Sequence, residues 1–158
     1  MILKAGSVEA EHLPSNYPDA VDPGGLCHTI PLSYAGKLEQ FGACVEWLDP
    51  GEHGALAHWH ESEDEFLYLL DGELTVFEDD VPHVLRAGEA ACWPAGVPVS
   101  HEMRNMGSRR ATYLITGTRR RDEFVHYPGV DLVLNRRDGA GFTHVDGTPY
   151  PPKTGAGT

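Results

Sequence analysis

The sequence has few cysteines and few basic residues, and both shortages exclude classes of protein. Its three cysteines, Cys27, Cys44 and Cys92, are an odd number, widely spaced, and form no CxxC pair. We therefore expect free, buried thiols and no disulfide framework. Twelve Lys and Arg residues stand against 24 Asp and Glu, for a formal charge of −12. An acidic surface repels nucleic acid and anionic membranes, so we expect neither as a partner.

Long apolar runs are also missing. The longest apolar stretch, residues 90–99, is interrupted by Pro94 and Pro98, so it cannot cross a bilayer. Residues 1–11 contain one lysine and no apolar run, which does not resemble a secretory signal. We therefore expect a cytoplasmic protein.

Helical periodicity is the third absence. No stretch of eleven or more residues repeats its apolar positions with a helical period, and the 158 residues include 18 glycines and 12 prolines. Such a composition suits short strands joined by tight turns and tolerates long helices poorly. The length allows one domain, and hardly two.

What the chain does contain is a series of short apolar segments separated by turn residues. Eight such segments, separated by turns at regular intervals, are typical of an antiparallel sandwich or barrel, so we predict an all-β fold. The predicted strands are 38–48, 55–60, 65–70, 73–77, 83–86, 90–93, 99–105 and 111–116.

The flanking regions differ from this central part. We expect residues 1–37 to form an N-terminal arm with one possible strand over 26–32, and residues 38–118 to form the barrel. Residues 119–158 are expected to form a C-terminal extension. Its last eight residues are predicted to be mobile, because they are rich in glycine, proline and threonine.

The chemistry centres on His58-Trp59-His60. Residues i and i+2 of a strand point to the same side, so both imidazoles are expected on one face. Glu65 begins the next predicted strand, and its carboxylate can point toward the two imidazoles. Two imidazoles and a carboxylate suit iron, manganese, nickel, cobalt or zinc.

The wider spacing resembles the two-part signature of the cupin family. His60 is followed by Glu65 and Gly72, and a second motif runs from Gly88 through Pro94 and Gly96 to His101 and Asn105. The resemblance implies a jelly-roll barrel, also called a double-stranded β-helix. By position it implies one divalent transition metal ion held by His58, His60, Glu65 and His101.

Two departures from the signature concern loop lengths. The segments from Gly51 to His58 and from Gly96 to His101 are both longer than in the family pattern. Both departures leave the ligand types intact and lie in loops that lead to ligand strands. Residues 141–150 also resemble the tail of small stand-alone bacterial cupins, some of which are called sugar-phosphate isomerases.

Other polar residues are weaker candidates. Glu63 and Asp64 are expected to be solvated turn residues, although Glu63 could reach the pocket and act as a base. Asn105 is expected at a strand end or turn. The remaining histidines are expected at the surface or in hydrogen bonds; they are His12, His28, His53, His83, His126 and His144.

Strand parity also predicts an apolar outer surface. If Glu65, Leu67 and Leu69 point inward, then residues 66, 68 and 70 point outward. These are Phe, Tyr and Leu, which need a cover. We predict a homodimer, because a second copy commonly buries such a face.

Three functions remain open from the sequence. The first is a metalloenzyme acting on a small oxygen-rich molecule, either as a dioxygenase or as a Lewis-acid isomerase or lyase. The second is a module that binds a sugar, sugar phosphate or small acid without turnover. The third, a structural or storage role, is disfavoured by the small size and acidic charge. A barrel that keeps the ligand pattern without a metal is the alternative to the metal site itself.

Overall fold

The computed structural model describes residues 1–24, 26–137 and 139–153, and it is almost entirely β-structure. The eight strands predicted for the barrel are all present, seven of them with shifted ends, and they confirm the all-β fold. They are β3 (Phe41–Leu48), β4 (Trp59–His60), β5 (Glu65–Asp71), β6 (Glu73–Glu78), β7 (Val81–Arg86), β8 (Ala90–Trp93), β9 (His101–Arg104) and β10 (Ala111–Thr118).

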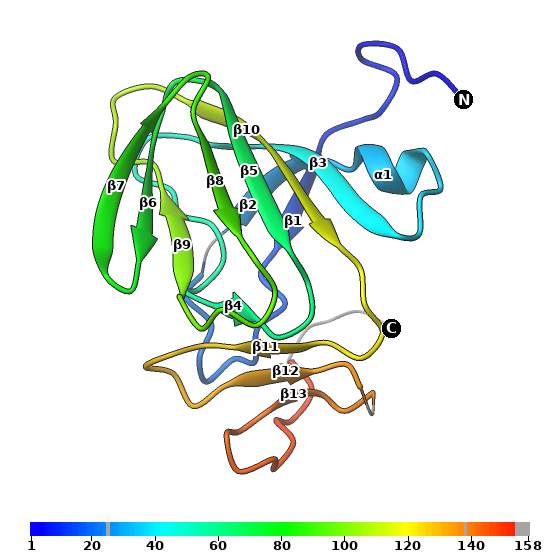
Figure 1. Ribbon diagram of the computed structural model, residues 1–158, viewed down its shortest axis with the longest axis vertical. Coiled ribbons are helices and arrows are strands. Elements are labelled where there is room, and N and C mark those ends of the chain that lie inside the picture. The colour runs from blue at the N-terminus through cyan, green and yellow to red at the C-terminus, as the bar shows by residue number, and fades with distance from the viewer. Residues whose placement is uncertain (25, 138, 154–158) are drawn as a thin grey trace.

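Two sheets enclose the core of the barrel. A six-stranded sheet in the order β1-β2-β3-β10-β5-β8 faces a three-stranded sheet in the order β7-β6-β9 (Figure 1). The first two strands of the larger sheet, β1 (Glu11–Pro14) and β2 (Leu26–Ile30), come from the N-terminal arm. The short helix α1 (Leu32–Ala35) follows β2. The arm therefore contributes more structure than the single strand expected for it.

The core between the two sheets is built from alternate strand residues. In β5, Leu67 and Leu69 are completely buried, whereas Phe66, Tyr68 and Leu70 are 37%, 38% and 45% exposed. This alternation confirms the parity predicted from the sequence. The other buried members of the cluster are Leu48, Leu74, Val76, Trp93, Met103, Ala111 and Tyr113.

The C-terminal extension forms a third sheet, which the sequence did not predict. Its strands are β11 (Phe124–His126), β12 (Val133–Asn135) and β13 (Gly141–Thr143). The order β13-β12-β11-β4 joins this sheet to β4, below the two barrel sheets in Figure 1. The predicted mobility of the last eight residues concerns mainly residues 154–158, which lie outside the described residues.

A second apolar cluster joins the arm to this extension. Tyr17 of the arm packs with Val125, Tyr127 and Leu132, all of which are buried. Lys153 of the extension also contacts the arm, because its ammonium group donates to the backbone carbonyl of Ser15 and pairs with Asp22. Both flanks of the barrel therefore pack on one another beside β4.

Two smaller expectations need correction. The strand predicted over 55–60 shrinks to Trp59–His60, because His58 makes only an isolated bridge to His101. Cys44 and Cys92 are free thiols as expected, but Cys92 is exposed. It lies opposite Phe66 on the edge strand β8, so it shares the outer face. The side chain of Cys27 lies outside the described part.

The described residues contain no helix with the length and apolarity that a bilayer crossing requires.

Candidate metal centre

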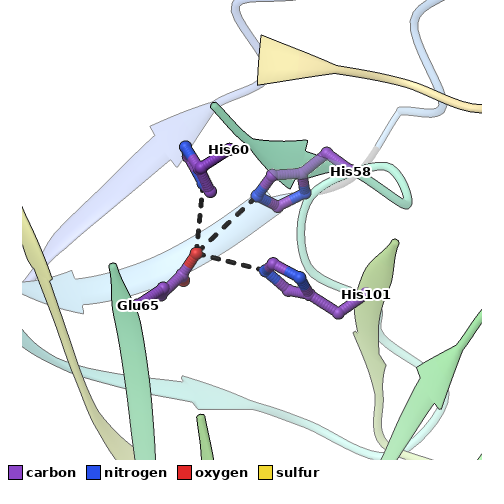
Figure 2. A group of neighbouring side chains, drawn as sticks. All are labelled: His58, His60, Glu65 and His101. Atoms are coloured by element: carbon purple, nitrogen blue, oxygen red, sulfur yellow. Dashed lines mark hydrogen bonds and ion pairs between the residues drawn. The ribbon is translucent and has the colours of Figure 1, made fainter. Parts of the chain in front are cut away.

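The four side chains predicted as ligands meet inside the barrel, at the end nearest β4. Glu65 Oε2 lies 3.1 Å from His101 Nε2, 3.2 Å from His60 Nε2 and 3.9 Å from His58 Nε2. In Figure 2 each of the three rings directs a nitrogen toward this oxygen, and in each ring this nitrogen is Nε2. One possible ligand atom from each residue falls within 4.8 Å of all the others.

Strand geometry explains this convergence. His58, just before β4, and His60, within it, lie two residues apart in extended chain, so their rings point to one side. His58 exchanges two backbone hydrogen bonds with His101, at 3.1 and 2.9 Å, which places β9 alongside. On the other edge of β4, His60 pairs with Val125 of β11. Glu65 is the first residue of β5 and faces the rings from the opposite sheet.

Hydrogen bonding and stacking orient the rings. His58 Nδ1 lies 2.7 Å from the carbonyl oxygen of Leu56. Because a carbonyl only accepts, Nδ1 carries the proton and Nε2 keeps a lone pair for a ligand. The ring of His101 is fully buried and stacks on Trp93, with centroids 3.9 Å apart and planes 12° apart. Trp93 is itself held by a hydrogen bond of 2.9 Å from its Nε1 to Glu78.

Burial and charge shift the pKa values in this cluster. Burial, followed by the neighbouring His101, lowers the pKa of His58 to about 4. Burial alone would raise the pKa of Glu65, but hydrogen bonds from His101 and His60 hold it well below its usual range. For His60, burial opposes protonation, but the carboxylates of Glu65, Glu123 and Glu63 together raise the pKa.

These donors fit a divalent transition metal. Three imidazole nitrogens and one ionised carboxylate are ligands that iron, manganese, nickel, cobalt and zinc accept. Without a cation, a buried group of this kind depends on mutual hydrogen bonds. The cluster is therefore able to bind a metal ion, and the donor types alone do not select which one.

A cavity of about 390 Å³ opens onto the cluster. His58, His60 and Glu65 form part of its wall, with Glu63, Asp64, Tyr113 and the two arginines Arg119 and Arg136. This size suits a small ligand. Part of the wall comes from the C-terminal extension, because Arg136 follows β12.

Glu63 is buried, which corrects the solvated turn residue expected from the sequence. Its Oε1 accepts a hydrogen bond of 2.6 Å from the backbone of Arg120 and one of 3.4 Å from Arg136. Both partners belong to the extension that closes over the turn. Asp64 remains exposed and accepts a hydrogen bond from the backbone of Ala95.

Asn105 has the structural role expected for it. Its amide nitrogen donates to the carbonyl oxygens of Leu48 and Arg109, and its oxygen accepts from Gly107. Among the other histidines, His126 contacts Glu61 and His144 contacts Asp131, each at 2.8 Å. These contacts agree with the hydrogen-bonded histidines expected from the sequence.

His28 has a neighbourhood that the sequence did not suggest. It lies close enough to Asp49 and Glu52 for the three to share a cation. However, Arg110 donates to both carboxylate oxygens of Asp49, at 2.8 and 3.0 Å. A guanidinium already neutralises this carboxylate, so we assign no metal there.

The main residue that sequence reasoning missed is Glu123. It is completely buried beside the loop that connects His60 to Glu65, and its Oε1 lies 3.4 Å from His60 Nδ1. No spacing rule points to it, because 62 residues separate it from the loop residue Glu61 that it contacts. Only the path of the extension brings it to the site.

Comparison with known proteins gives the family. Residues 45–117 match the family model described as Cupin domain. A solved structure of a cupin-superfamily sugar phosphate isomerase from Silicibacter pomeroyi is 32% identical, with a TM-score of 0.82, and the match covers 96% of this chain and 97% of that one.

Two further relatives give less information, one because its sequence identity is lower and the other because its match is shorter. A protein from Acidithiobacillus ferrooxidans with a provisional sugar phosphate isomerase name is 24% identical over 92% of this chain and 91% of its own, with a TM-score of 0.81. This likeness shows the fold alone. Protein SchB from Streptomyces halstedii is 40% identical over 67 residues, which are 42% of this chain and 46% of SchB, so less than half of that relative is matched. From the full-length match at 32% identity and the Cupin domain match, the chain belongs to the cupin superfamily.

Proposed function

We propose that this protein is a metal-dependent isomerase that acts on a small phosphorylated sugar. The observation that carries the proposal is the convergence of His58, His60, Glu65 and His101 on one point in the wall of a ligand-sized cavity. The sugar phosphate isomerase name of the Silicibacter pomeroyi relative, which aligns over nearly its whole length, favours isomerisation over oxygen chemistry.

The metal would be held by the four predicted ligands. A bound divalent ion supplies Lewis-acid polarisation of a carbonyl group. Protein residues around the cavity would do the rest of the work. Arg119 and Arg136 offer guanidinium groups to an anion such as a phosphate, and Glu63 offers a carboxylate that can carry a proton between neighbouring carbons.

Glu63 is suited to the proton-carrying role by its position. It lies in the cavity wall, and its side chain is anchored by Arg120 and Arg136. An anchored carboxylate transfers a proton in a fixed geometry, which a solvated turn residue does not offer. This is the role the sequence suggested for Glu63, now as part of the proposed isomerase.

The test combines metal analysis with a search for turnover. The untagged native protein is analysed by mass spectrometry for bound metal, then incubated with phosphorylated aldoses and ketoses in D₂O and followed by NMR. We expect interconversion of one aldose–ketose pair, with deuterium incorporated beside the carbonyl. Oxygen consumption with oxidised products would replace the isomerase by a dioxygenase. A sugar phosphate that raises the melting temperature but is recovered unchanged would make the protein a binding module.

We also propose that the protein is a homodimer that buries the outer face of β5. Phe66, Tyr68 and Leu70 are partly exposed at alternate positions of that strand, on its outer face, and water is a poor environment for such a row. Light scattering after size exclusion should give about twice the chain mass of 17.3 kDa.

A charge in the middle of this face should separate the copies. We expect Tyr68→Glu to elute as a monomer, because a carboxylate in an apolar interface loses its hydration without gaining a partner. Val84→Glu is the matched control, since Val84 is also exposed but lies on β7 in the other barrel sheet. A native protein that is monomeric at all concentrations tested would refute the dimer.

A further inference from the structure

We infer that Glu123 is a positioning residue of the metal centre: it accepts a hydrogen bond from Nδ1 of His60 and so directs the His60 Nε2 lone pair at the metal. The inference rests on the metal site proposed above. It assigns a role to the C-terminal extension, which lies beyond the residues 45–117 that match the Cupin domain.

Glu123 is held in place by three donors from one loop. Its Oε1 accepts from the backbone of Glu61 at 3.0 Å. Its Oε2 accepts from the backbone of Ser62 at 3.0 Å and from the Ser62 hydroxyl at 2.7 Å. A carboxylate with 0% exposure is tolerated only with such pairing. The loop that joins the ligands His60 and Glu65 is therefore tied to the extension.

The backbone strengthens this connection. Glu61 also donates its backbone N–H to the carbonyl oxygen of Phe124, at 3.0 Å, and His60 pairs with Val125 in the β11–β4 ladder. Glu123 itself accepts a backbone hydrogen bond of 2.9 Å from Arg136 across the extension. Glu123 thus directly precedes β11, and backbone hydrogen bonds tie this part of the extension to both β4 and the residue that follows β12.

His60 needs the acceptor that Glu123 offers. A neutral imidazole that binds a metal through Nε2 carries its proton on Nδ1, and that N–H requires a partner. Nδ1 of His60 is buried and has no hydrogen-bond partner among the described residues. Its distance to Glu123 Oε1 is 3.4 Å, slightly longer than a good hydrogen bond, so a small ring rotation completes the contact.

Glu63 is the competing acceptor, and the geometry favours Glu123. Glu63 Oε2 lies farther from His60 Nδ1, at 3.8 Å. Its other oxygen is engaged by Arg120 and Arg136. With Glu123 as the partner of His60, the Oε2 atom of Glu63 stays free to accept a proton from a substrate in the cavity.

The experiment measures Co²⁺ binding to the metal-free protein by calorimetry and by the visible absorption of the bound ion. Removal of a carboxylate partner from a metal-binding histidine typically weakens affinity about 10–100-fold, and we expect this range for Glu123→Gln, with a changed absorption spectrum. Ser62→Ala is the matched control: it removes one bond to Glu123 but leaves the His60 contact. It should lower the melting temperature without changing the affinity or the spectrum.

Each other outcome contradicts the inference in a distinct way. Native affinity and spectrum in Glu123→Gln would overturn the role of Glu123 but leave the metal site standing. A greater loss in Glu63→Gln than in Glu123→Gln would make Glu63 the partner of His60. Failure of the native protein to bind Co²⁺ would overturn the proposed site and this inference together. If Glu123→Gln does not fold, Glu123→Asp retains the charge but draws it back from His60, and the same loss of affinity is expected.

Discussion

A Glu65→Ala protein is expected to lose its metal completely. Glu65 is the only carboxylate among the four predicted ligands, and its Oε2 is the point on which all three Nε2 atoms converge. Its removal takes away the negative charge that offsets a divalent cation in a buried site. Metal analysis by mass spectrometry should fall from about one ion per chain, as expected for a site of this type, to background.

Two comparisons make the result specific. His58→Ala should lose the metal as well, because it removes an imidazole whose Nε2 lone pair points into the cluster. His83→Ala should keep it, since His83 is an exposed histidine on β7. Retention of near-stoichiometric metal by Glu65→Ala would place the ion elsewhere in the protein and remove the basis of the proposed isomerase.

The second large effect is expected from Gly72→Ala, in the tight connection between β5 and β6. Gly72 has φ of +88°, and a Cβ there would lie 2.4 Å from the carbonyl oxygen of Arg110 and 2.9 Å from the Cα of Ala111. Both neighbours are backbone atoms of the adjacent segment of the same chain, so they cannot move away as a flexible side chain would. We expect the free energy of unfolding to fall by more than about 3 kcal/mol, measured by urea unfolding.

Gly51→Ala separates the two causes of this loss. Gly51 has a similar φ of +86°, but a Cβ there meets nothing within 4 Å. It should therefore cost only the backbone strain, about 1 kcal/mol. Equal losses in the two variants would show that the close approach of Arg110 and Ala111 contributes nothing, contrary to expectation.

Much of the barrel was predictable because its signals are local. The alternation from Glu65 to Leu70 follows from the period of a strand, and the structure buries Leu67 and Leu69 as that period requires. His58 and His60 share a face for the same reason. The match to the family spacing placed His101 beside them, and the structure brings these side chains together.

The environment of Glu63 was not predictable. Taken locally, a carboxylate in a polar turn is solvated, which is how the sequence was interpreted. The structure buries it because Arg120 and Arg136, 57 and 73 residues later, fold over the turn. Each strand of the extension has only three residues, which is too short to show a period.

The sequence by itself determined the strand pattern, the cupin family and the set of candidate ligands, because each depends on spacing within a strand or on motif spacing along the barrel. Only the tertiary structure decided that the C-terminal extension pairs with β4 and delivers Glu123 and Arg136 to the site. The physical reason is that these contacts join residues some 60 or more positions apart. Their pairing depends on how the whole chain packs, which no local pattern of apolar and polar residues encodes.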